Sequence, residues 1–135
     1  MSQDAESEEL LRLSQQLLES IAKNDFATYA ALSDPGLTGV EPQSFGTLLE
    51  GLEFHKYNMS HLRFDRADHR TTLAEPRVRL IGPDVAIVTF TRINQRVTTE
   101  GQLAQFASLE TRIWQKQAGK WKHVHFHRSD LVMSK

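Results

Sequence analysis

Residues 84–95 read DVAIVTFTRINQ, and their side chains alternate between two kinds of surface. Ala86, Val88 and Phe90 form one apolar row that continues into Arg92. Successive side chains of a β-strand point to opposite faces, so alternation at every second residue is typical of a strand. This segment therefore predicts a strand that has one face in the core and an arginine at the end of the apolar row.

Three further segments, 69–80, 103–116 and 120–130, also have strand character. The pairs between the strands, Gly82-Pro83, Glu100-Gly101 and Ala118-Gly119, are residues that form tight turns. Consecutive strands joined by short turns predict an antiparallel meander. Because the strands follow helical segments in the chain, the expected fold class is α+β, with N-terminal helices packed on one face of a curved antiparallel β-sheet.

The N-terminal half has helical spacing. Apolar residues three or four positions apart predict a first helix from Glu6 to Lys23; they are Leu10, Leu13, Leu17, Leu18 and Ile21. Asp25 is expected to cap a short second helix over 26–32. DPG at 34–36 predicts a turn, 38–42 a short extended piece, and 44–57 a third helix. We expect residues 1–5 to be a disordered tail and residues 6–135 to form a single domain.

Composition limits the classes of partner. The chain has 135 residues, 39% of them hydrophobic, a formal net charge of −1 and no cysteine. Near-zero net charge gives no general attraction to nucleic acid or to an anionic membrane, and no apolar run approaches the roughly 20 residues of a membrane span. The acidic N-terminus is not a secretion signal, so we expect a cytoplasmic protein. We expect no cofactor, and no nucleic-acid or membrane partner.

Three strands each place an arginine in line with apolar neighbours. Arg92 follows Phe90, Arg128 follows Val124 and Phe126, and Arg112 shares a face with Glu110. If these faces converge, three guanidinium groups approach one pocket, where Glu110 or a bound carboxylate offsets their repulsion. The alternative is that each arginine pairs with its own carboxylate or reaches the rim of the protein.

Three histidines alternate along the last strand. His123, His125 and His127 occupy every second position, which predicts that they share the face opposite Phe126 and Arg128. Alternate histidines can bind zinc, but the chain has no cysteine and no carboxylate is aimed at that face. We expect structural or interface histidines and no metal site.

Six segments resemble the association (hub) domain of calcium/calmodulin-dependent protein kinase II, over about Glu6 to Ser129. They are NDFATYAAL, DPGLTGVEP, LLEGLEFHKY, EPRVRLIGPDVAIV, ETRIW and GKWKHVHFHRS. The resemblance implies the NTF2-like, or SnoaL-like, fold, a cone formed by a long helix and a curved sheet around a pocket. It also implies a homo-oligomer, possibly a ring of paired subunits. Departures at residues 61–71 and in the tail LVMSK leave the ring size open.

The resemblance further implies a ligand pocket. In that family arginines bind small carboxylates, and the matching positions are Arg92, Arg112 and Arg128, with His55 as a pocket-lining histidine. With Tyr57 and Glu110 these complete the expected ligand-binding set, and no catalytic residue is assigned. Kinase activity and calmodulin binding do not carry over, because the chain has no glycine-rich phosphate loop, no HRD or DFG motif and no basic amphipathic helix.

Two functions remain open. The first is an oligomerisation domain, favoured by Ile87, Leu109 and Ile113 on the second faces of their strands, where apolar side chains call for a cover. The alternative is an enzyme of the SnoaL or ketosteroid-isomerase kind, which does acid/base chemistry in the cone. Its candidate groups are His55, Tyr57 and Glu110, with the arginines stabilising an anion.

Overall fold

The computed structural model describes residues 3–61 and 69–131, so most of the divergent stretch 61–71 lies outside the described residues. The chain begins with two helices and ends with four long strands. In order, the elements are α1 (Gln3–Ala22), α2 (Phe26–Leu32), β1 (Ser33–Val40), the 3-10 helix η1 (Pro42–Ser44), β2 (Leu49–Glu50), α3 (Glu53–His61), β3 (His69–Ile81), β4 (Val85–Val97), β5 (Leu103–Gln117) and β6 (Lys120–Asp130).

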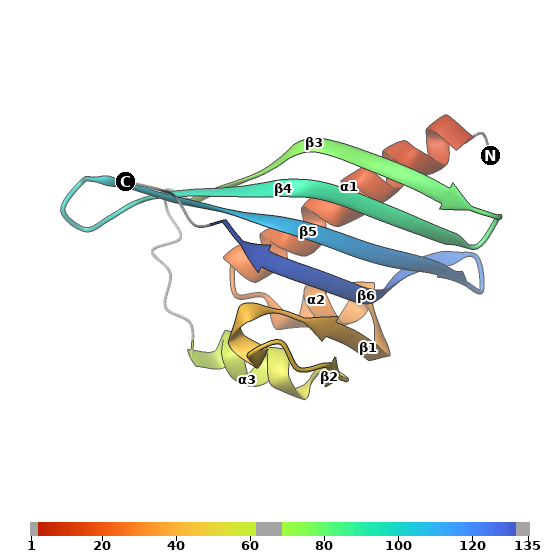
Figure 1. Cartoon of the computed structure of the whole chain (residues 1–135), viewed down its shortest axis with the longest axis horizontal. Coiled ribbons are helices and arrows are strands. Elements are labelled where there is room, and N and C mark those ends of the chain that lie inside the picture. Colours follow the sequence, from red (N-terminus) through yellow and green to blue (C-terminus); the bar gives the residue numbers. More distant parts are fainter. Residues whose placement is uncertain (1–2, 62–68, 132–135) are drawn as a thin grey trace.

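One six-stranded sheet organises the fold, in the order β2-β1-β6-β5-β4-β3. Strands β3 to β6 form the predicted antiparallel meander, and each predicted boundary lies within two residues of the observed one. Strand β1 extends the sheet by pairing parallel to β6. Figure 1 shows α1 crossing one face of the sheet, which we call the inner face; the opposite face is the outer face. The α+β prediction is confirmed.

The first two helices follow the predicted pattern. Helix α1 begins at Gln3, so residues 3–5, which were expected to belong to a disordered tail, are helical. Helix α2 has the predicted cap, because Asp25 Oδ1 accepts a hydrogen bond from the Thr28 N–H at 3.2 Å. Among residues 3–61 and 69–131, no helix combines the length and the apolar character needed to cross a membrane.

The segment after α2 differs from its prediction. Residues 34–36 belong to β1, within the stretch where pairing with β6 shifts register between Ser33 and Thr38. The predicted helix over 44–57 is wrong, since this segment holds the end of η1, strand β2 and the start of α3. Phe45 and Gly46 have φ angles of 55° and 76°, in the left-handed region that ends a helix. The leucine spacing of 48–52 resembles a helical face, but the left-handed backbone at Phe45 and Gly46 keeps a helix from running through this segment.

The core lies between α1 and the inner face. Leu10, Leu17 and Leu18 of α1 and Val88 and Trp114 of the sheet are at most 1% exposed. Burying each such side chain contributes about 1.5–3 kcal/mol. These are the positions that the helical and strand periods assign to the core.

Strand β1 approaches the core closely at Gly39. A Cβ atom there would lie 2.2 Å from Cε1 of Phe126, closer than carbon atoms can pack. The absence of a side chain at Gly39 therefore allows β1 to lie against the ring of Phe126, which forms part of the floor of the cavity described below.

A β-bulge in β6 separates the three histidines. Ile113 pairs with His125, but Trp114 pairs with His123, so Val124 is an extra residue on β6. The bulge reverses the alternation: His123 is fully buried on the inner face, His125 is partly buried, and His127 is exposed. The prediction that all three share one face is wrong, because the extra residue lets both His123 and Phe126 pack into the core.

Candidate functional site

A cavity of about 420 Å³ opens between the inner face, α3 and η1. The arginines of three neighbouring strands line it, Arg92 from β4, Arg112 from β5 and Arg128 from β6. They are 8%, 2% and 9% exposed, so these cations are largely removed from water. This is the placement expected from strand parity, whereas anion binding by these residues stays a prediction.

Glu110 holds two of the arginines. Arg112 donates to Glu110 Oε1 from Nη2 at 2.6 Å and from Nε at 2.9 Å, and Ser108 Oγ donates to Oε2 at 3.0 Å. Arg92 Nε lies 3.2 Å from the same Oε2 atom. Burial alone would raise the pKa of Glu110, but Arg112 and Arg92 outweigh burial and the pKa is lowered. Glu110 is therefore a fixed counter-ion of Arg92 and Arg112, and unlike these arginines it does not itself line the cavity.

Arg92 and Arg112 have further partners. With the amide of Asn94 oriented so that its oxygen faces Arg92, Oδ1 accepts from Arg92 Nε at 2.8 Å and Nδ2 donates to Thr71 at 2.9 Å. The guanidinium carbon of Arg112 lies 4.7 Å from the ring centroid of Phe126. These contacts orient both guanidinium groups before any ligand arrives.

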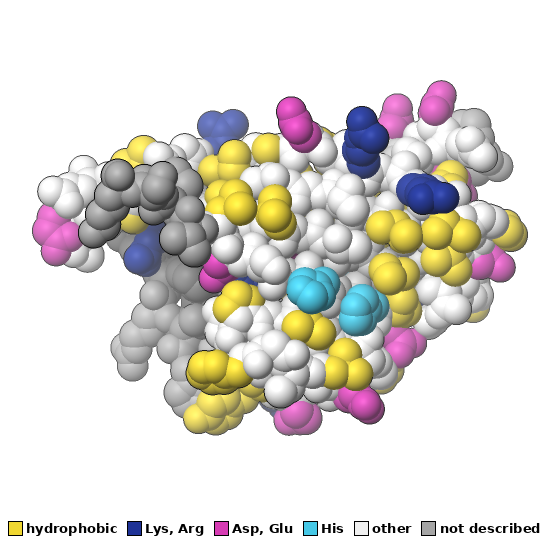
Figure 2. Space-filling view, in the orientation of Figure 1, with side chains coloured by type: hydrophobic (Ala, Val, Ile, Leu, Met, Phe, Trp, Pro, Cys, Tyr) yellow, Lys and Arg dark blue, Asp and Glu magenta, His cyan; other side chains and the backbone are white. Residues whose placement is uncertain are grey.

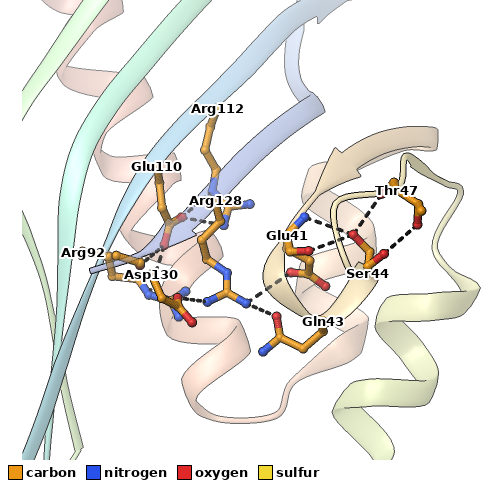
Figure 3. Close-up of polar contacts among 10 residues, drawn as sticks. Glu41, Gln43, Ser44, Thr47, Arg92, Glu110, Arg112, Arg128 and Asp130 are labelled. Carbon is orange, nitrogen blue, oxygen red and sulfur yellow. Dashed lines mark hydrogen bonds and ion pairs between the residues drawn. The ribbon is translucent and has the colours of Figure 1, made fainter. Parts of the chain in front are cut away.

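Arg128 connects the sheet to the segment that covers the cavity (Figure 3). Its Nη1 lies 2.7 Å from Asp130 Oδ1, and its Nη2 donates to Gln43 Oε1 and lies 3.6 Å from Glu41 Oε2. The carboxyl group of Glu41 is buried, and burial raises its pKa although Arg128 and Arg112 oppose the shift. The carboxyl groups that pair with Arg128 are thus more exposed than Glu110, the partner of Arg112.

Sequence reasoning missed Glu41, Gln43, Asn94 and Asp130. Asn94 and Asp130 could have been found, because each stands two residues after an arginine and so shares its strand face. No pattern marks Glu41 and Gln43, since their contact with Arg128 depends on the path that the chain takes after β1.

His55 lines the cavity as expected, at 8% exposure. Its ring lies 5.4 Å from the Tyr29 ring and 5.3 Å from the Phe126 ring, measured between centroids. Burial, together with the nearby Arg112 charge, lowers the pKa of His55 to about 4. His55 is therefore neutral near pH 7 and offers hydrogen-bonding nitrogens rather than charge.

Tyr57 departs from the expectation. Its side chain is 66% exposed and does not line the cavity, so its assignment to the pocket is wrong. Residues 53–61 are helical, and neighbours two positions apart on a helix point in different directions. With His55 directed inward, Tyr57 is directed outward.

The acid/base groups expected for the enzyme alternative are not set up for proton transfer near neutral pH. A general base near neutral pH needs a matched pKa, but the pKa values of Glu110 and His55 are both lowered and Tyr57 lies outside the cavity. Over the described ranges, 3–61 and 69–131, no three His, Cys, Asp or Glu side chains are grouped to hold a metal ion.

Comparison with known proteins agrees with this architecture. The family model described as the calcium/calmodulin dependent protein kinase II association domain matches residues 6–131. The chain belongs to this association-domain family. Calcium/calmodulin-dependent protein kinase type II subunit delta from Oryctolagus cuniculus is 37% identical to it over 126 residues, which are 93% of this chain and 24% of that protein. The chain thus spans about a quarter of the length of this curated relative.

Solved structures place the association domain within a wider fold. The association domain of C. elegans CaMKII superposes with a TM-score of 0.86 at 36% identity, covering 93% of this chain and 96% of that one. An NTF2-like superfamily protein from Salmonella enterica superposes with a TM-score of 0.74 at 20% identity, covering 99% and 96%. The second likeness shows the fold alone. The predicted family and the predicted NTF2-like fold are both confirmed.

Proposed function

We propose that this association domain assembles with further copies of itself through the outer face of its sheet and binds a small carboxylate in its arginine-lined cavity. Antiparallel sheets with one solvated face normally carry polar side chains there. Here Ile87 and Ile113 form a cross-strand pair on the outer face, and Leu109 of the same face is 49% exposed. Figure 2 shows hydrophobic side chains beside histidines on this face.

The apolar outer face carries the assembly proposal. Exposed apolar side chains spread over neighbouring strands favour a protein partner. Membership of a family of association domains favours a second copy as that partner. Paired subunits that close into a ring are the finer form of the proposal. Partly buried His125 of β6 pairs with Ile113 across the strands, and its Nδ1 atom is 2.7 Å from Thr38 Oγ1 of β1.

Sedimentation velocity on Ile113→Asp tests the assembly surface. A charge in the middle of a buried interface leaves a desolvated carboxylate without a partner, so this variant should sediment as a smaller species than the unmodified chain. Lys56→Asp, at an exposed position of α3, introduces the same side chain away from the sheet and should not change the mass. An Ile113→Asp variant of unchanged mass would place the interface elsewhere.

The convergence of three buried arginines carries the carboxylate proposal. Glu110 neutralises part of the charge of Arg92 and Arg112, and Arg128 pairs instead with Asp130 and Glu41, which a ligand carboxylate could replace. A guanidinium group offers paired donors to a planar carboxylate, and each charge-assisted bond contributes roughly 1.5–3 kcal/mol net. His55 can add a neutral hydrogen bond.

Calorimetric titration of glycolate tests this binding. Arg128→Ala should weaken binding by at least about tenfold, which corresponds to about 1.4 kcal/mol. Lys56→Ala removes an exposed cation outside the cavity and should bind as the unmodified chain does. Thermal unfolding shows whether Arg128→Ala is folded, and Arg128→Lys replaces it if not, because lysine cannot bind bidentately. Equal affinities in all folded variants would contradict the site.

A further inference from the structure

The three carboxyl groups around the arginines are held to different degrees. Glu110 is fully buried and makes hydrogen bonds as short as 2.6 Å with Arg112. The Asp130 side chain is 49% exposed, so water shares its interaction with Arg128. Glu41 is 11% exposed, yet its Oε2 atom is 3.6 Å from Arg128 Nη2, beyond the usual 2.7–3.2 Å of a hydrogen bond. Glu41 is thus shielded from water and loosely paired.

The backbone holds Glu41 at this position. Glu41 lies between β1 and η1, and the Ser44 hydroxyl accepts from its N–H at 3.2 Å and donates to its carbonyl oxygen at 2.8 Å. Figure 3 shows the Glu41 side chain pointing toward Arg128, with a dashed line joining the two. Its carboxylate therefore sits beside the guanidinium group that a ligand from outside would also contact.

We propose that Glu41 controls ligand entry: its carboxylate competes with a bound carboxylate for Arg128, so ligand affinity rises when Glu41 loses its charge by taking up a proton. The inference rests on the proposed carboxylate binding. Two carboxylates beside one guanidinium group repel each other, and repulsion is strong where water is excluded. A neutral Glu41 removes the repulsion and can donate a hydrogen bond to the incoming oxygen.

The charges facing Glu41 make it the group that responds to pH. Burial raises the pKa of Glu41, although the charges of Arg128, Arg112 and Arg92 oppose the shift. Across the cavity, burial lowers the pKa of His55 to about 4 and raises the pKa of Tyr29 to about 12. Both are neutral between about pH 5 and 8. Glu110 is tied to Arg112, and Asp130 lies at the exposed side of Arg128.

Glycolate is a suitable probe because it is a stronger acid than a glutamate side chain and stays ionised where Glu41 takes up a proton. Glycolate is titrated calorimetrically into the unmodified chain, Glu41→Gln and Glu50→Gln, at pH 7.5 and at about pH 5.5. Repeating each titration in buffers of different ionisation enthalpy measures the protons taken up on binding. Glu50 is an exposed residue of β2, so Glu50→Gln is the same chemical change outside the cavity.

We expect Glu41→Gln to bind glycolate at least about tenfold more tightly than the unmodified chain at pH 7.5, a difference of about 1.4 kcal/mol. The unmodified chain and Glu50→Gln should bind more tightly at the lower pH and take up a proton on binding, and Glu41→Gln should not. If Glu41→Gln does not fold, the proton uptake of the unmodified chain tests the inference alone. Glycolate binding without proton uptake would then overturn it.

The outcomes separate this inference from the proposed function. If Arg128→Ala abolishes binding but Glu41→Gln binds as the unmodified chain does, the role of Glu41 is overturned and the carboxylate site stands. If neither the unmodified chain nor Glu41→Gln binds glycolate at either pH, both are overturned. If Glu41→Gln binds glycolate at pH 7.5 and the unmodified chain does not, the competition by Glu41 is supported. The site of the unmodified chain then binds only at lower pH.

Discussion

Each face of the sheet carries side chains that are unusual for its surroundings. The inner face contains buried charges, Arg92, Glu110 and Arg112, each at most 8% exposed. The outer face of the same strands presents apolar side chains such as Leu109, which is 49% exposed. Buried charges are costly unless paired, and exposed apolar surface is costly unless covered. The buried charges of the inner face are compensated within the chain, whereas the apolar side chains of the outer face call for a cover.

The largest effect should come from the inner face. Glu110→Gln removes the counter-ion of Arg92 and Arg112 and leaves two buried cations without full compensation. We expect the free energy of unfolding to fall by about 3–5 kcal/mol in urea titrations. The neighbouring change Thr111→Ala, on the outer face of the same strand, should cost about 0.5 kcal/mol or less. Similar losses at both positions would contradict the contrast between the faces.

Acid should destabilise the fold through His55 of α3, which is buried against the cavity. The pKa of His55 falls from its ordinary 6.5 to about 4 on folding, because burial and Arg112 disfavour the charged ring. Between these values the unfolded chain binds a proton that the folded chain does not, so stability is full above pH 6.5 and declines as the pH falls toward 4. The loss at pH 4 should be about 3 kcal/mol from this group.

Urea unfolding of His55→Gln at pH 7 and about pH 4 isolates that contribution. The variant should lose less stability on acidification than the unmodified chain, since glutamine does not titrate. Lys56→Gln, at the exposed neighbouring position, controls for a change of residue in α3. An identical decline in His55→Gln and the unmodified chain would show that His55 is not buried in neutral form.

A smaller effect should follow from steric change beneath the cavity. Gly39→Ala places a Cβ atom 2.2 Å from the Phe126 ring, so β1 or the ring must move. Overpacking of this kind costs typically about 1–3 kcal/mol, measurable as a lower midpoint of thermal unfolding. Gly36→Ala meets the flexible Asp34 side chain at 3.1 Å and serves as the matched control, with a smaller loss. Equal midpoints would mean that β1 is not held against Phe126.

Much of the fold follows from local periods in the sequence. The strands were predictable because alternation and turn residues act over a few positions, and the same parity placed Arg92, Arg112 and Glu110 on one face. The inward turn of His123 was not predictable, because a bulge at Val124 leaves the alternating sequence unchanged. The leucine spacing of 48–52 likewise predicts a helix, although Phe45 and Gly46 just before it adopt left-handed φ angles that end helical structure.

The candidate site was predictable where it lies on the sheet and not where it lies on connecting segments. Arg128 follows from strand parity, whereas its contacts with Glu41 and Gln43 depend on how η1 folds back over the cavity. Tyr57 was misplaced because it stands two positions from His55 on α3, so it points away from the cavity that His55 lines. Contacts between residues that are far apart in the chain, such as those that close this cavity, leave no pattern in a single sequence.

The central claim is that the outer face of the sheet joins copies of the chain. Static light scattering on the purified, unmodified chain at tens of micromolar tests it most directly. The account predicts a mass several times the 15.4 kDa of one chain, in a single defined species. A mass equal to one chain would contradict the claim, because the apolar outer face would then be stable in water without a cover.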